Sequence, residues 1–348
     1  ALEKIGMSGM LKETEKIIRI DSEGNRTDYV DYLNTLYSQS SHGNSGVVAK
    51  SKTTNSFDDL TYIKTKLDKR LIDDIMNLKY KLVVITGNAG DGKTAFIKQI
   101  ESRNVPVKPK TVGNGSTFTI NGVKFETNYD GSQDEESKLN NDVLNAFFEP
   151  FFDLDDYNKA SEGRIIAINE GRLVDFLSQQ PRLKKFEKNI EEFFFNEGHV
   201  DLLPGLIVIN LNLRSITARE GDSQSLLGQQ IQKMVARELW TKCEGCPVAE
   251  KCFIKYNADT FRDSSVGLEV TNRLEWLLRT IVYKRELHVT MRDLRSMIAY
   301  MLTRDYSCEQ VKILIDVVQT EGLRSYYWQY YYFNITAPAM KPNIASFN

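Results

Sequence analysis

Residues 81–100 read KLVVITGNAGDGKTAFIKQI and carry the strongest structural signal in the chain. The first six residues are a short, β-branched apolar run, which is typical of a strand buried on both faces of a parallel sheet. A glycine-rich turn follows, and the apolar spacing over 95–100 predicts a helix. The turn matches the pattern G-x-x-x-x-G-K-[ST], which binds phosphates when it joins a strand to a helix. This context predicts that the chain binds a nucleoside triphosphate.

The residue types of this turn suit phosphate binding. Glycines let successive backbone N–H groups point at one centre, and the following helix adds the positive end of its dipole. Lys93 supplies a cation for the β- and γ-phosphates, and the Thr94 hydroxyl is placed to bind Mg²⁺. No N-K-x-D motif for guanine follows, which favours ATP. The expected nucleotide-binding residues are Gly87, Asn88, Ala89, Gly90, Asp91, Gly92, Lys93, Thr94 and Ala95.

Strand and helix patterns alternate on both sides of this turn. Asn121-Gly122 separates two alternating runs and predicts a hairpin, because both residues tolerate positive φ. Alternating strands and helices are typical of an α/β fold with a wound, mostly parallel sheet. The other predicted strands are 164–169 and 205–211, and the other predicted helices are 59–80, 142–152, 183–195 and one that begins near residue 172.

Composition divides the chain into three parts. Residues 1–58 are polar and weakly periodic, which predicts an extension and linker with a short helix at 10–20. Residues 59–222 carry the α/β pattern, and long helical patterns over 223–348 predict an all-helical lid domain. The lid helices are expected at 226–240, 269–285 and 291–305, and the aromatic run 326–334 is expected to pack in a core or an interface.

Hydrolysis needs an acidic residue on a neighbouring strand that holds Mg²⁺ and orients water. Asp130 follows the second arm of the hairpin and is the expected residue, with Asp134 and Glu135 just beyond it. An ordinary acidic loop is the alternative. Asn169 ends a later strand, where its amide would orient the attacking water, although Asn also favours a helix N-cap. Glu170 would polarise the water if Asp130 only holds the metal.

Two arginines, Arg292 and Arg295, begin a helix in the predicted lid and share one face. Residues 290–293 form a capping pattern at the start of this helix. We expect an arginine here to reach the phosphates and to report whether the γ-phosphate is present; solvated helix charge is the alternative. No arginine finger is assignable, and Arg214 and Arg219 are only guesses for that role.

Three of the four cysteines, Cys243, Cys246 and Cys252, follow the spacing C-x₂-C-x₅-C. A C-x-x-C turn presents two thiolates to one ion, and a third Cys completes one face of the site. Cys308 is the expected fourth ligand of a structural Zn²⁺ site in the helical domain. An iron–sulfur cluster and free thiols are the alternatives. The weaker choices for the fourth ligand are His199 and His288.

The composition restricts the class of protein. With 41% hydrophobic and 26% charged residues, the 348-residue chain is not wholly disordered. A net charge of -2 argues against a DNA-coating protein. Lys184, Lys185 and Lys188 nevertheless form a small basic helical face, so nucleic acid stays a less favoured partner. No apolar run is long enough for a membrane span and no secretion signal is found, so we expect a cytoplasmic protein without a membrane partner.

The loop, the hairpin acid, the Asn-ended strand and the arginine helix, in that order, resemble AAA+ and STAND-like P-loop ATPases. More narrowly, the segments TYIKTKLDKRLIDDIMNLKYKLVVITGNAGDGKTAFIKQIE, NYDGSQDE, IIAINEGRL, CEGCPVAEKC and VTMRDLRSMIAYML resemble the ATPase module of bacterial anti-phage defence proteins. Its relatives are DptF-like restriction ATPases, and a similar module is joined to BREX-type kinase proteins. The resemblance covers about residues 60–335.

This resemblance implies Mg²⁺-dependent ATP hydrolysis that drives or switches a larger assembly. The expected assembly is a homo-oligomer or a defence complex with a separate effector, since the 348 residues show no nuclease, helicase or kinase motif. The chain departs from the family pattern where Asn-Tyr-Asp-Gly replaces an Asp-Glu pair after the hairpin. That departure supports an alternative function, a non-hydrolysing ATP-gated scaffold that regulates a partner effector.

Overall fold

The computed structural model describes residues 28–37, 56–103, 106–110, 114–134, 139–219, 221 and 223–318. Contacts between Cα atoms group the chain into two compact units. Unit 1 comprises residues 1–45, 235–262 and 296–348, and unit 2 comprises residues 46–234 and 263–295. The chain therefore alternates between the units rather than completing one before the other.

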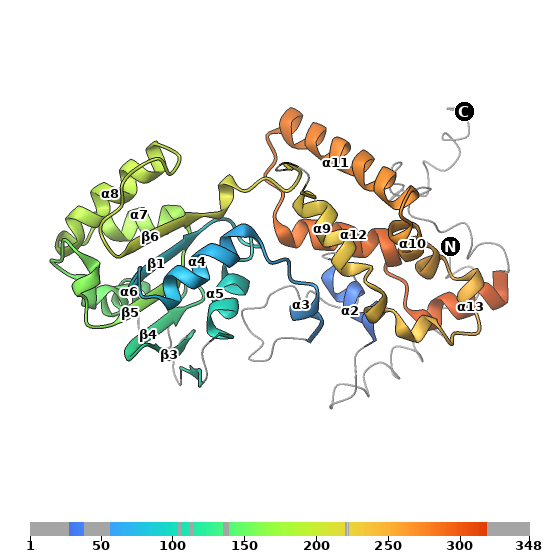
Figure 1. The fold of residues 1–348 in the computed structure, drawn as a ribbon, viewed down its shortest axis with the longest axis horizontal. Coiled ribbons are helices and arrows are strands. Elements are labelled where there is room, and N and C mark those ends of the chain that lie inside the picture. Colours follow the sequence, from blue (N-terminus) through green and yellow to red (C-terminus); the bar gives the residue numbers. More distant parts are fainter. Residues whose placement is uncertain are drawn as a thin grey trace. The chain divides into compact units, whose positions relative to one another are not determined.

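The described residues of unit 2 build a mixed, mostly parallel sheet of six strands in the order β2-β3-β4-β5-β1-β6 (Figure 1). Strand β1 pairs in parallel with β5 and β6, and β4 pairs in parallel with β5. At the other edge, β2 and β3 pair antiparallel with their neighbours. The bounds are β1 (Leu82–Thr86), β2 (Lys108–Pro109), β3 (Ser116–Ile120), β4 (Val123–Asn128), β5 (Gly163–Ala167) and β6 (Leu206–Asn210).

Helices cover both faces of this sheet (Figure 1). Alternate residues of β1 divide between two apolar clusters: Leu82 and Val84 pack in one, and Val83 and Ile85 in the other. All five residues of β1 are buried, as the apolar run predicts. The α/β class is therefore confirmed. The first cluster includes α6 (Asn140–Phe148), α7 (Glu170–Ser178) and α8 (Lys184–Phe195), and the second includes α4 (Lys66–Met76) and α5 (Lys93–Glu101).

The predicted hairpin is confirmed by the pairing of β3 with β4. Its turn residues Asn121 and Gly122 have φ values of +45° and +82°, which explains why this dipeptide stands between the two strands. The hairpin thus adds an antiparallel edge to the parallel strands, and β4 then runs toward the carboxyl edge of the sheet.

Unit 2 also contains two helices that the sequence places in the lid, α9 (Leu226–Met234) and α11 (Val266–Arg285). They contact each other, and buried Glu275 of α11 binds the connection that precedes α9. Its carboxylate forms an ion pair with Arg219 at 2.6 Å and accepts a hydrogen bond from Ser225. The predicted boundary between residues 222 and 223 therefore does not coincide with an edge of either unit.

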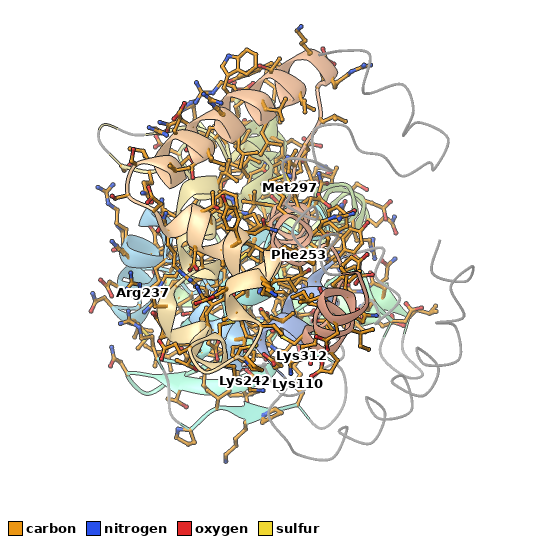
Figure 2. All side chains as sticks on the ribbon, turned by 90° about the vertical axis from the view of Figure 1, so that its right-hand side faces the viewer. Lys110, Arg237, Lys242, Phe253, Met297 and Lys312 are labelled. Atoms are coloured by element: carbon orange, nitrogen blue, oxygen red, sulfur yellow. The ribbon has the colours of Figure 1, made fainter. Side chains whose placement is uncertain are left out.

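The described part of unit 1 is helical, with α2 (Tyr29–Leu36), α10 (Phe253–Arg262), most of α12 (Met291–Thr303) and α13 (Cys308–Val318). Phe253, which Figure 2 labels, is fully buried and meets Tyr306 edge-on. Buried Asn257 donates hydrogen bonds to the carbonyl oxygens of Met301 and Leu302. These contacts join α10 to the end of α12.

Residues 28–37 depart from the prediction of a polar extension. They form α2, in which Tyr29, Val30 and Leu33 are buried, and the Asp28 side chain caps the helix by accepting the Val30 N–H. The apolar stripe is only eight residues long, too short to stand out against its polar surroundings. The predicted helix at 10–20, Glu135 and the aromatic run 326–334 lie outside the described residues.

Three helices are much shorter than their spacing predicts. The pattern over 59–80 gives only α4, because a capping box of Thr65 with Asp68 starts the helix at Lys66 and it ends at Met76. The helix predicted over 226–240 is α9, which already ends at Met234 and is followed by a 3₁₀ turn at Arg237–Leu239. The pattern over 142–152 gives α6 to Phe148, and a 3₁₀ turn containing Pro150 follows. Across the described ranges, no helix combines the length and the apolar character that a membrane span requires.

Candidate functional site

Residues 87–94, called the glycine loop below, join the carboxyl end of β1 to the start of α5. Gly87, Gly90 and Gly92 have φ values of +145°, +103° and +93°, a region that L side chains rarely adopt. Gly92 is the N-cap residue of α5, so the loop ends at the positive pole of that helix. The backbone itself therefore requires glycine at the positions where the motif places it.

The Lys93 ammonium group lies on the glycine loop. Its Nζ donates hydrogen bonds to two loop carbonyl oxygens at 2.7 and 2.8 Å. Burial lowers the pKa of Lys93, the Asp91 and Asp130 carboxylates act to raise it, and Arg292 acts to lower it. The charges of two acids and one arginine therefore act on this ammonium group.

The Thr94 hydroxyl contacts the segment that carries Asp130. Thr94 Oγ1 donates to the carbonyl oxygen of Tyr129 at 3.2 Å. The carboxylate of Asp130, the next residue, accepts the Ser132 N–H at 3.0 Å and Gln133 Nε2 at 2.9 Å. The two residues predicted to bind magnesium are thus brought together by the fold, although they are 36 positions apart in the sequence.

A buried carboxylate holds this arrangement in place. Glu101, at the end of α5, accepts hydrogen bonds from Ser116 at 2.5 Å and Thr127 at 2.8 Å through Oε1, and from the Tyr129 hydroxyl at 2.8 Å through Oε2. Burial and the charge of Glu101 raise the pKa of Tyr129, so its hydroxyl stays protonated and donates. Glu101 therefore fastens the helix that follows the glycine loop to the strand that ends beside Asp130.

Asn169 and Glu170 follow β5, which lies between β1 and β4. Asn169 is exposed and caps α7, with Oδ1 accepting the Gly171 N–H at 2.9 Å. The capping alternative is therefore confirmed for Oδ1, and the role of the amide toward water stays a prediction. The Gly131 N–H donates to the carbonyl oxygen of Ala167 at 2.7 Å, which joins the segment after Asp130 to the end of β5.

The neighbouring acid Asp134 has a structural partner. Its Oδ1 accepts the backbone N–H of Asn140, the first residue of α6, at 2.7 Å. This bond satisfies a donor at the helix start, where helices lack internal partners. The Asp134 carboxylate therefore stabilises the start of α6, whereas the charge of Asp130 acts to raise the pKa of Lys93.

The first turn of α12 lies against the glycine loop within unit 2. The Arg292 N–H donates to the carbonyl oxygen of Gly90 at 3.1 Å. A Cβ atom at Gly90 would stand 2.8 Å from Thr290 Oγ1 and 3.0 Å from Arg292 Cβ. The predicted capping pattern is present, since Thr290 and Asp293 exchange side chain-to-backbone hydrogen bonds at 3.1 and 3.2 Å.

The two predicted arginines have different partners in the structure. The exposed Arg292 has no ion-pair partner among the described residues and lies close enough to affect the pKa of Lys93. The Arg295 guanidinium instead binds Asp58 at 2.9 Å and Thr61 at 3.1 Å. Arg295 therefore fastens α12 to the segment at α3 (Ser56–Leu60), and only Arg292 lies at the glycine loop.

Further contacts of the glycine loop were missed at the sequence level. His288 Nε2 lies 2.8 Å from Asp91 Oδ1, whereas the sequence suggests His288 only as a weak zinc ligand. Arg214 donates to the Asp91 carbonyl oxygen at 2.5 Å, and Asn212 Oδ1 accepts the Asn88 N–H at 3.0 Å. His288 and Asp91 are 197 positions apart, so no local spacing reveals the pair. Arg214 therefore binds the glycine loop of the same chain.

The four cysteines lie in unit 1. Burial, followed by the nearby Cys252 and Cys246 thiols, raises the pKa of Cys243 to about 11. Burial also raises the pKa of Cys308, with Cys243 among the groups that add to the effect. In the part of the chain that the structure describes, no group of three or more His, Cys, Asp or Glu side chains is arranged to hold a metal ion. The arrangement does not support the zinc expectation, which stays a prediction.

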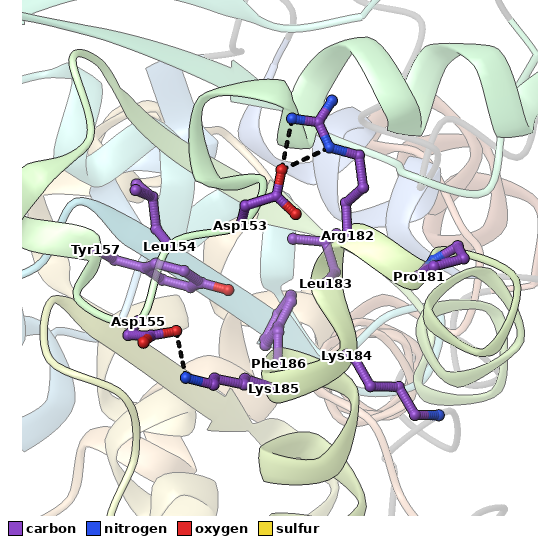
Figure 3. A pocket seen from close by; sticks show the side chains of 10 residues that line it. All are labelled: Asp153, Leu154, Asp155, Tyr157, Pro181, Arg182, Leu183, Lys184, Lys185 and Phe186. Atoms are coloured by element: carbon purple, nitrogen blue, oxygen red, sulfur yellow. Dashed lines mark hydrogen bonds and ion pairs between the residues drawn. The ribbon is translucent and has the colours of Figure 1, made fainter.

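A cavity of about 230 Å³ lies elsewhere in unit 2, between the segment after α6 and the start of α8 (Figure 3). Its charges pair with each other, Asp153 with Arg182 and Asp155 with Lys185, both at 2.6 Å. Lys184 and Lys188 of the predicted basic face also have ion-pair partners, in Glu187 and Glu192. This face is therefore neutralised by its own acids, which disfavours nucleic-acid binding there.

We predict that Glu101→Ala lowers the free energy of unfolding by roughly 2–5 kcal/mol, because the buried Ser116 and Thr127 hydroxyls and the half-buried Tyr129 hydroxyl lose this acceptor. Denaturant unfolding of the full chain measures the change. Glu192→Ala is the matched control: its carboxylate is 48% exposed and 3.8 Å from Lys188, so a change within about 0.5 kcal/mol is expected. Equal losses in both variants would contradict the structural role of Glu101.

Alanine at Gly90 should be more harmful than alanine at Gly122. Both glycines have positive φ, which costs an alanine roughly 1–2 kcal/mol, but a Cβ at Gly122 meets nothing within 4 Å. At Gly90 the Cβ displaces Thr290 and Arg292, adding about 1–3 kcal/mol. Denaturant unfolding compares the two variants, and equal destabilisation would mean that α12 does not pack on the loop.

Comparisons of the chain with models of protein families, with curated proteins and with solved structures found no match.

Proposed function

We propose that the chain binds ATP together with Mg²⁺ and hydrolyses it. The observation that carries this proposal is the glycine loop, which lies between a fully buried central strand and the N-terminus of α5. Its three positive-φ glycines, the helix dipole and the Lys93 ammonium group together suit the polyphosphate of a nucleotide. On phosphate binding, Lys93 would exchange its two loop carbonyl partners for phosphate oxygens.

The residues around the loop fit a magnesium-assisted phosphoryl transfer. Mg²⁺ prefers oxygen ligands, and the Thr94 hydroxyl and the Asp130 carboxylate would hold it. The ion neutralises the charge that develops on the phosphate oxygens. Asn169, which follows the strand between β1 and β4, would orient the attacking water, and Glu170 is the second choice for its activation. Arg292 would contact the γ-phosphate, because its side chain is exposed and its backbone binds Gly90 of the glycine loop.

We further propose that hydrolysis drives or switches a larger cytoplasmic assembly in anti-phage defence, as a homo-oligomer or with a separate effector. This part rests on the resemblance of the sequence motifs to defence ATPase modules, and fold-level likeness alone does not establish function. Nucleic acid is the less favoured partner, because the three lysines of the basic helical face each have an acidic partner.

An ATP-gated scaffold without hydrolysis is the second candidate. The Asp130 carboxylate already accepts two hydrogen bonds from the turn that follows it. If these bonds persist with nucleotide bound, Asp130 cannot both hold the metal shell and orient water. The chain would then bind ATP and change shape without turning it over, and the partner would read the bound state.

We expect Lys93→Ala to raise the Kd for Mg·ATP by about ten- to a hundredfold, since charge-assisted hydrogen bonds to phosphate contribute about 1.5–3 kcal/mol. Asp130→Asn should lower the rate of phosphate release about a hundredfold or more, because it removes charge from the metal site while keeping the side-chain shape. Phosphate release from the full chain, together with titration calorimetry, measures both effects.

Matched controls make this experiment decisive. Asp134→Asn is the control for Asp130, since an amide oxygen can still accept the Asn140 N–H, and Lys188→Ala removes an exposed lysine far from the loop in sequence. Both controls should release phosphate at the rate of the unsubstituted chain. Tight ATP binding with no phosphate release from the unsubstituted chain would favour the scaffold, and no binding at all would reject both functions.

We expect substitution of the two arginines of α12 to have different effects on turnover and on stability. Arg292→Ala is expected to lower turnover about a hundredfold with little change in the free energy of unfolding, since its guanidinium is exposed. Arg295→Ala is expected to lower the free energy of unfolding by about 1–3 kcal/mol, because it removes the hydrogen bonds from the guanidinium to Asp58 and Thr61. Phosphate release and denaturant unfolding of both variants test this, and the reverse pattern would show that the assignment is wrong.

A further inference from the structure

The Asp91 carboxylate is an unusual group to find inside a loop that receives phosphates. Asp91 is 1% exposed, and burial of a carboxylate is unfavourable unless hydrogen bonds and nearby charges compensate it. A negative charge here also opposes the binding of an anion. The partners of Asp91 therefore decide whether the glycine loop can accept phosphates.

One carboxylate oxygen shapes the loop itself. Asp91 Oδ2 accepts the Asn88 N–H at 2.7 Å, and a Cβ atom at Gly87 would stand 3.0 Å from the same oxygen. The side chain thus folds back under the first turn of the loop. The Asn88 N–H is shared with Asn212 Oδ1 at 3.0 Å, and Asp91 Oδ2 is the nearer acceptor, so the position of this carboxylate contributes to the curl of the loop.

The other carboxylate oxygen has a partner from a remote segment of the same unit. His288 Nε2 lies 2.8 Å from Asp91 Oδ1, and the His288 side chain is 27% exposed. His288 belongs to the connection between α11 and α12, four residues before Arg292, whose N–H binds Gly90. Two consecutive loop residues, Gly90 and Asp91, are therefore held by the segment that starts α12.

We propose that His288 is a positioning residue that holds the Asp91 carboxylate and thereby couples the shape of the glycine loop to the docking of the α12 N-terminus. The proposal rests on nucleotide binding at this loop. With the segment docked, the Nε2 contact compensates Asp91 and keeps its second oxygen on Asn88. With the segment displaced, Asp91 loses this partner and its charge opposes the phosphates.

This coupling is distinct from the role proposed for Arg292. Asp91 lies in the loop that contacts any nucleotide phosphate chain, whereas Arg292 is proposed to contact only the γ-phosphate. Loss of His288 should therefore weaken ADP and ATP binding equally. Because coupling between two sites is reciprocal, nucleotide binding should also stabilise the docked first turn of α12.

The test is a calorimetric titration of the full chain with Mg·ADP and with Mg·ATP. We expect His288→Ala to raise both Kd values by about five- to fiftyfold. His288→Gln, whose amide offers an N–H donor in place of Nε2, should restore both Kd values to within about threefold of those of the unsubstituted chain. In an Asp91→Ala background, His288→Ala should have no further effect, as a double-mutant cycle requires.

Hydrogen exchange gives a second readout that a general loss of stability would not reproduce. In the unsubstituted chain and in His288→Gln, Mg·ADP should slow amide exchange in residues 290–296; in His288→Ala it should not. Unchanged Kd values and unchanged ADP-dependent protection in His288→Ala would overturn the positioning role while nucleotide binding stands. Equal impairment of His288→Gln and His288→Ala would overturn the donor role of Nε2. A chain that binds neither nucleotide would reject the proposed function and this inference together.

Discussion

Parallel hydrogen bonding of β1 to β5 on one side and β6 on the other is the constraint on which the site depends. Parallel strands run in the same direction, so their carboxyl ends lie at the same edge of the sheet. The segments after β1, β4 and β5 therefore meet, although they lie far apart in the sequence. This edge is also where α/β sheets generally bind their ligands.

Buried polar side chains then fix the groups at this edge. Glu101 joins α5 to the strand before Asp130, and Asp91 closes the glycine loop on itself. Both side chains are almost fully buried, and both oxygens of each carboxylate have polar partners. Removing either carboxylate would therefore be unfavourable for stability. A sheet alone would bring the segments near each other, but these two acids decide which side chains face the loop.

The start of α12 combines three tasks within eight residues. His288 and the Arg292 backbone contact the glycine loop, the Arg292 side chain is exposed, and Arg295 binds Asp58. These contacts all lie in the first two turns of α12 and the connection before it. Under the proposed function, a nucleotide bound at the glycine loop would therefore contact the residues that start α12.

The sequence by itself determined the features that depend on local patterns. The apolar run of β1, the glycine loop and the Asn121-Gly122 hairpin follow from burial on two faces and from tolerance of positive φ, which are properties of neighbouring residues. The role of Asp91 and the distinction between Arg292 and Arg295 were decided only by the tertiary structure. The same holds for the grouping of α9 and α11 with the unit that contains the sheet. The reason is physical: contacts such as His288 with Asp91 join residues 197 positions apart, and only the packing of the whole unit determines which remote side chains meet.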